Sequence, residues 1–159
     1  MKQLIITICI LFVTYFNSFS QTFSQQNFKF DGICNLQNAV NTVDENGNKV
    51  TVYQCVNQAS SINVYRINVI AFKAIITDIE EYYRSLKKEY SNLGTPTSTT
   101  LKGKKAVQVI ENVTIEGHSM KQISVSTLYK NKAITLVLVT NSSSYSTLLS
   151  NFKNQFSFL

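Results

Sequence analysis

The segment from Ala133 to Val139 limits the fold of this chain more than any other. It is apolar at almost every position, whereas apolar and polar residues alternate between Met120 and Tyr129. Successive side chains of a strand point to opposite faces of a sheet, so an alternating strand needs only one covered face. A strand that is apolar on both sides must lie within a sheet covered on both faces. The segment 133–139 therefore predicts a central strand between two packing layers.

A helix over residues 77–93 is expected to form one of these layers. Thr77 and Glu80 have the spacing of a capping box. Gly94 suits a left-handed helix end, and Pro96 prevents the helix from continuing. Residues at spacings of three and four form one apolar stripe: Ile79, Tyr82, Tyr83, Leu86, Tyr90 and Leu93.

The remaining periodic segments complete the layers. The expected strands are 28–36, 50–57, 62–70, 97–101, 106–115, 120–129 and 133–140. Three short dividers suit tight reversals: Lys102-Gly103-Lys104, Glu116-Gly117-His118 and Lys130-Asn131-Lys132. A second helix begins after a cap at Ser143 or Ser144 and has apolar residues at helical spacing up to Phe156. The pattern predicts an α+β fold in which an antiparallel β-sheet of about six to seven strands is flanked by two α-helices.

The first residues have the pattern of a cleavable export signal. Lys2 precedes an apolar run from Leu4 to Phe16, which is shorter than the ~20 residues that cross a bilayer as a helix. Ser18 and Ser20 have the small side chains that signal peptidase accepts, which predicts a cut before Gln21. We therefore expect a signal peptide at 1–20 and a single α/β domain at 21–159. That domain would be periplasmic or extracellular and would have no membrane anchor.

Two cysteines, Cys34 and Cys55, follow the leader. An even number of cysteines in a small exported domain favours a disulfide bond. However, a two-residue turn at Asn46-Gly47 would pair Cys34 with Ala59, several residues along the strand from Cys55. Either the segment 38–48 is a longer loop, which we favour, or the disulfide is absent.

The charge of the chain argues against nucleic acid as a partner. The chain has 15 basic and 9 acidic residues, and the basic ones are scattered. The nearest approach to a basic cluster is Lys102, Lys104 and Lys105 around Gly103, which suits an exposed hairpin tip. A nucleic-acid groove requires a longer basic stripe with interleaved aromatic residues.

Residues that carry catalysis are scarce. His118 is the only histidine, and no carboxylate is spaced to orient its imidazole, so a hydrolase that uses His118 is a distant alternative. A single histidine also cannot form a multi-histidine metal site. The five glycines are spread singly, without a phosphate-binding loop. We expect no enzyme activity, no catalytic residue, no cofactor and no metal site.

The order of elements from Val64 to Phe158 also carries a family resemblance. It consists of a strand, a capped helix, the strand-turn-strand LKGKKAVQV, the hairpin LYKNKAITLVLV and the closing helix LLSNFKNQFSF. In this order the chain resembles the photosystem II PsbP family, the Ran release factor that shares its α/β/α sandwich, and small exported bacterial proteins of unassigned role. The Cys34 to Cys55 segment has no counterpart there. A cystatin-like or nuclear-transport-factor-like roll is the alternative fold.

The resemblance implies a protein that binds other proteins or assists assembly, with no catalytic residue to carry over. We therefore expect a non-catalytic binding or assembly-accessory protein whose partner is another envelope or secreted protein. The alternative is a small-ligand or lipid carrier that uses the space between the helix 77–93 and the sheet. Tyr82 lies at the edge of the apolar stripe, and we assign it with Lys102, Lys104 and Lys105 to a candidate ligand or partner surface.

Overall fold

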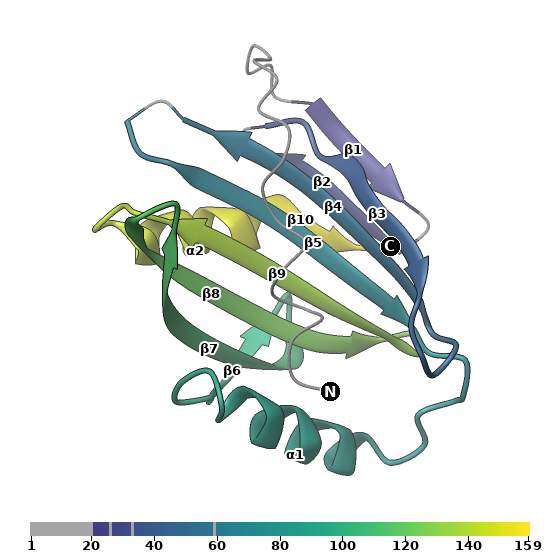
Figure 1. Ribbon diagram of the computed structural model, residues 1–159. Helices are drawn as coiled ribbons and strands as arrows, with labels where there is room; N and C mark the ends of the chain where they lie inside the picture. The colour runs from purple at the N-terminus through teal and green to yellow at the C-terminus, as the bar shows by residue number, and fades with distance from the viewer. Residues whose placement is uncertain (1–20, 26, 33, 59) are drawn as a thin grey trace.

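The computed structural model describes residues 21–25, 27–32, 34–58 and 60–159. The expected signal peptide at 1–20 lies outside the described residues, so its removal stays a prediction. A seven-stranded antiparallel sheet forms the centre of the structure (Figure 1). In spatial order its strands are β3 (Gln37–Val43), β4 (Lys49–Asn57), β5 (Asn63–Ala71), β9 (Lys132–Thr140), β8 (His118–Tyr129), β7 (Lys104–Ile115) and β6 (Thr97–Leu101).

The apolar segment 133–139 forms most of β9, the middle strand of the seven, as predicted. Ile134, Leu136 and Leu138 are fully buried on one face of the sheet. Val137 and Val139 are each 4% exposed and point to the other face. Both faces of the central strand are therefore covered.

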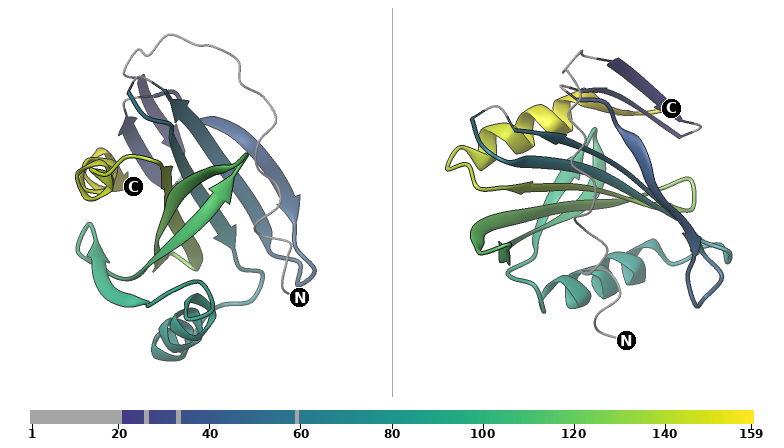
Figure 2. Two further views of the ribbon diagram at one scale, coloured as in Figure 1. Left: turned by 60° about the vertical axis from the view of Figure 1, so that its left-hand side comes forward. Right: turned by 45° about the horizontal axis from the view of Figure 1, so that its top comes forward.

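The two predicted helices lie on opposite faces of this sheet (Figure 2). Helix α1 (Ile79–Tyr90) packs on one face, which we call the α1 face, and α2 (Tyr145–Gln155) packs on the other, which we call the α2 face. The fold is thus α+β with an antiparallel sheet between two helices, as expected from the sequence.

A three-stranded sheet, not foreseen from the sequence, completes the α2 face. It has the order β1 (Gln21–Gln25), β2 (Phe28–Gly32), β10 (Phe156–Phe158). Phe28 stacks on Phe156 at 5.6 Å, and the ring of Phe30 meets that of Phe152 at 5.6 Å. The prediction of one strand over 28–36 was therefore wrong, because the inward-pointing aromatic residues of β2 pair with the C-terminal strand of this second sheet.

Both ends of α1 differ from the sequence prediction. Asp78, not Thr77, is the N-cap, and its carboxylate accepts a hydrogen bond from the Glu81 backbone N–H at 2.8 Å. The helix ends at Tyr90, and Gly94 does not adopt the left-handed conformation. A side chain at Gly94 would place its Cβ 2.5 Å from the Ile110 carbonyl oxygen. Glycine is needed here because the backbone approaches β7.

The three predicted reversals are two-residue turns. Both central residues have positive φ in each turn: Lys102 and Gly103, Glu116 and Gly117, Lys130 and Asn131. This is the type I′ geometry that matches the twist of paired strands. Asn131 also fixes the connection between β5 and α1, since its Oδ1 accepts from the Ile76 N–H at 2.8 Å and its Nδ2 donates to the Phe72 and Ala74 carbonyls.

Cys34 and Cys55 form a disulfide bond with a Cα–Cα distance of 5.9 Å. The tight two-residue turn at Asn46-Gly47 is absent, because residues 44–48 form a longer turn around the Asp44 carboxylate. The expected loop over 38–48 is also absent, since β3 occupies most of it. Two features bring the cysteines together. The β3–β4 register shifts between Asn38 and Val40, and β3 begins only at Gln37, so Cys34 lies outside the paired part of the strand.

Candidate binding face

Helix α1 covers only part of its face of the sheet. Its buried residues Tyr83 and Tyr90 pack with Val107 and Val109 of β7, and Leu128 of β8 adds to the same cluster. No residue of β3, β4 or β5 belongs to this cluster. The helix lies along the β7–β8 side in Figure 1, away from β3 and β4.

Hydrogen bonds fix the covered half. The Tyr83 hydroxyl donates to the Lys105 carbonyl at 2.6 Å and accepts from the Leu128 backbone N–H at 3.1 Å. The Tyr90 hydroxyl bonds to Ser126, which in turn bonds to Thr135. Burial raises the pKa of Tyr90, so its hydroxyl remains protonated at neutral pH. These bonds hold both tyrosine rings in the space between the helix and the sheet.

The other half of the α1 face has no helix over it among the described residues. We call this half the open face, and define it by the residues of β3, β4 and β5 that share one side of the sheet: Gln37, Val40, Thr42, Val50, Val52, Gln54, Val56, Val64, Arg66, Asn68 and Ile70. Gln37 and Thr42 on the edge strand β3 and Val56 are exposed, and the others are half-buried. The open face is thus an apolar surface with three polar side chains at its centre.

Two observations describe this polar centre. Arg66 Nε donates to the Gln54 side-chain oxygen at 3.2 Å across the β4–β5 pair. Asn68 lies two residues after Arg66 in β5, on the same face of the sheet. Its Oδ1 is enclosed but accepts no hydrogen bond from the described residues. An enclosed acceptor without a donor costs about 1–3 kcal/mol. The centre of the open face therefore holds an enclosed acceptor that no described donor satisfies.

Tyr82 does not extend from the molecule as a free platform. Its ring meets those of Phe72 at 6.0 Å and Tyr83 at 5.2 Å, both edge-on. The pKa of Tyr82 is raised well above the usual tyrosine range, mainly because burial desolvates its hydroxyl. The ring thus closes the gap between α1 and the end of β5, and its role in binding stays a prediction.

The structure does not bring the three predicted surface lysines together. Lys105 pairs with Glu80 of α1 at 2.7 Å and lies over the Tyr83 ring. Lys102 donates to the Asn154 carbonyl at the end of α2, at 3.0 Å. Lys104 lies 5.9 Å from the centre of the Tyr129 ring. Successive residues of this hairpin point to opposite faces of the sheet, so their ammonium groups diverge.

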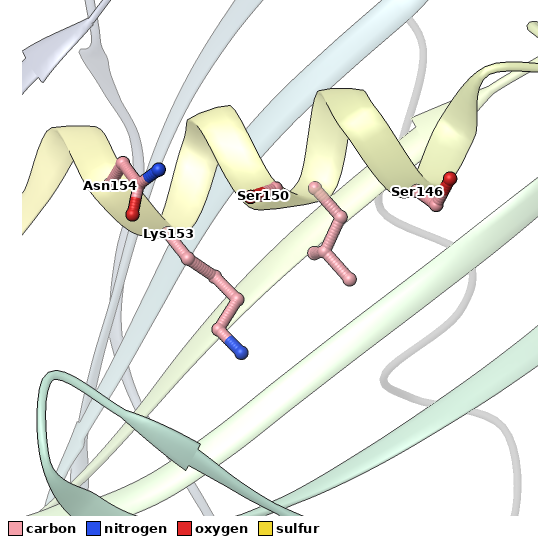
Figure 3. Close-up of a pocket in the computed structure, with 5 residues that line it drawn as sticks. Ser146, Ser150, Lys153 and Asn154 are labelled. Atoms are coloured by element: carbon pink, nitrogen blue, oxygen red, sulfur yellow. The ribbon is translucent and has the colours of Figure 1, made fainter.

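A carrier that uses the space beneath α1 would need room there, and the rings of Tyr83 and Tyr90 fill that space. A hollow of about 320 Å³ lies instead along α2, lined by Ser146, Leu149, Ser150, Lys153 and Asn154 (Figure 3). All five residues come from one helix, and Ser146, Ser150 and Asn154 are exposed. This arrangement cannot enclose a ligand.

His118 begins β8 and is exposed, and it forms no hydrogen bond with a described carboxylate. Among the described residues, no three histidine, cysteine or acidic side chains are grouped so that they could hold a metal ion. None of the helices in the described ranges has the length and apolar character needed to cross a membrane. No protein-family model matches the chain, and no curated protein matches it.

Proposed function

We propose that this chain is an exported protein that binds another polypeptide through the open face and catalyses no reaction. The observation that carries the proposal is the partial cover of the α1 face, in which no described helix packs on the row of valines on β4. Contiguous apolar patches with polar groups are typical of protein interaction sites. The valines would supply the buried area of the interface.

The polar centre favours a polypeptide over a purely apolar ligand such as a lipid chain. A lipid chain has no hydrogen-bonding group for the half-buried Gln54 side chain, whereas every residue of a polypeptide has a backbone C=O and, except for proline, an N–H. A partner segment laid across β4 and β5 would contact the valines and the Gln54 side chain together.

Export is part of the proposal. The Cys34–Cys55 disulfide is typical of proteins from oxidising compartments, and the leader pattern at 1–20 agrees with that setting. We also propose kinship with the PsbP-like α/β/α sandwich. The helices on both faces of the sheet support this sandwich over a cystatin-like or nuclear-transport-factor-like roll, in which a helix covers one face.

Site-specific photo-crosslinking in the native envelope tests the proposal. A photoreactive residue at Val52, in the middle of the open face, should yield one discrete crosslinked polypeptide. The same residue at Thr147, exposed on α2, is the matched control and should not yield it. Identical products from both positions, or no product from Val52, would reject the open face as the binding surface.

A further inference from the structure

A separate hollow of about 150 Å³ lies on the α2 face, where the end of β1 and the start of β2 stand over β4 and β5. Lys49, Thr51 and Tyr53 of β4 and Lys132 of β9 line it. The rest of the lining is Gln25, Asn27, Phe28, Val69 and Ala71. The lining thus combines apolar residues with polar and charged side chains.

The strand register places the two lysines on the same side of the sheet. Lys49 pairs with Ala71, and Ala71 pairs with Lys132. Registered residues on neighbouring strands share a face, and the strands lie about 4.8 Å apart, so the two lysine Cα atoms are about 10 Å apart. Only the methyl group of Ala71 lies between them. Both ammonium groups can therefore reach one ligand placed above Ala71.

The lining has two positive charges and no acidic residue. The ion pairs between described residues are Lys29–Asp31, Arg84–Glu81 and Lys105–Glu80. Lys49 and Lys132 take part in none of them, and the hydroxyls of Thr51 and Tyr53 have no hydrogen-bond partner in the described part of the chain. Burial raises the pKa of Tyr53, so its hydroxyl is a neutral donor at physiological pH.

We propose that this hollow binds a small organic carboxylate. Ammonium and hydroxyl donors without a competing acid suit an anionic acceptor. Phe28, Val69 and Ala71 suit an apolar body attached to it. A cavity of about 150 Å³ in an unrelated engineered protein accommodates benzene, so a body of one six-membered ring fits this space. The site lies on the opposite side of the sheet from the open face, so the two proposals are independent.

Amide NMR spectra of the purified protein, titrated with sodium benzoate at neutral pH and low ionic strength, test this site. We expect saturable shifts that centre on Thr51, Ala71 and Lys132. Benzyl alcohol, which has the same ring without the charge, should cause no such shifts. Shifts spread over the whole surface, or equal shifts with benzyl alcohol, would overturn the proposal.

Charge-removing variants identify the groups that bind. Lys49→Gln and Lys132→Gln should each weaken benzoate binding by about tenfold, because each removes one charge-assisted hydrogen bond. Lys88→Gln, at an exposed position of α1, is the matched control and should leave the affinity unchanged. Unchanged affinity in the double variant would overturn the site. Inorganic phosphate that binds as tightly as benzoate would overturn the requirement for an apolar body.

Discussion

The Tyr83 hydroxyl joins α1 to the central sheet by accepting the Leu128 backbone N–H at 3.1 Å while donating to the Lys105 carbonyl at 2.6 Å. One side chain thus satisfies backbone groups of two neighbouring strands. It therefore fastens α1 over the β7–β8 side of the sheet, away from the open face.

Tyr83→Phe should lower the free energy of unfolding by about 1–3 kcal/mol, because it leaves the part-buried Leu128 N–H without the Tyr83 acceptor. Tyr82→Phe is the matched control, since the Tyr82 hydroxyl bonds to no described group, and we expect a change of at most about 0.5 kcal/mol. Urea denaturation of both variants measures the difference. Equal losses would show that the Tyr83 hydrogen bonds contribute nothing beyond the packing of the ring.

Asn68→Leu should raise the free energy of unfolding by about 1 kcal/mol, because it removes an enclosed acceptor that lacks a donor. Thermal denaturation measures the difference. A loss of stability in this variant would show that contacts of the Asn68 side chain outweigh the cost of its unsatisfied acceptor.

Gly94→Ala should lower the free energy of unfolding by about 1–3 kcal/mol, since its Cβ would lie 2.5 Å from the Ile110 carbonyl oxygen and 3.3 Å from a Val109 methyl group. Gly103→Ala is an instructive comparison, because the position has open space but a φ of +77°. There the cost is backbone strain alone, about 1 kcal/mol. Chemical denaturation of both variants distinguishes steric contact from strain.

Asp44 should make stability depend on acid pH. Hydrogen bonds from the Asn48 side chain and backbone lower the pKa of Asp44 below its usual value. A carboxyl whose pKa is lowered by folding stabilises the protein above its unfolded pKa of about 4, and this contribution is lost as the pH falls through the folded value.

Asp44→Ala should therefore lower the melting temperature at neutral pH and have a smaller effect at strongly acid pH. Glu45→Ala, in the same turn but with an exposed side chain in no described hydrogen bond, is the control. Melting curves over a pH series give the measurement. A loss that is the same at every pH would assign the role to turn geometry and not to the charge of Asp44.

Reduction of the Cys34–Cys55 disulfide should cost about 3 kcal/mol of stability, because it releases the loop that the bond closes in the unfolded chain. Cys34→Ser/Cys55→Ser should show the same loss without reductant. Non-reducing peptide mapping should recover Cys34 and Cys55 in one linked fragment. Recovery of both as free thiols would contradict the bond.

The central layers of the fold could be predicted because their signals are local. The position of 133–139 follows from its own composition, and α1 and the three turns follow from their own residues. The division of 28–36 could not be predicted, because the choice of β10 as the partner of β2 depends on residues at the far end of the chain.

The candidate sites depend on register, which the sequence does not display. Lys49 and Lys132 become neighbours only because both pair with the β5 strand at Ala71. The open face likewise depends on how far α1 extends across the sheet. By contrast, Lys102, Lys104 and Lys105 are adjacent in sequence, and the hairpin geometry separates their side chains.

The disulfide also determines how the molecule would respond to mechanical tension. It joins Cys34, just after β2, to Cys55 within β4 of the large sheet. A force applied to the N-terminal end of the described chain can peel away β1 and β2 and extend the segment before Cys34. Further extension is stopped there, because the load passes through the sulfur atoms into β4, which is paired with a strand on each side.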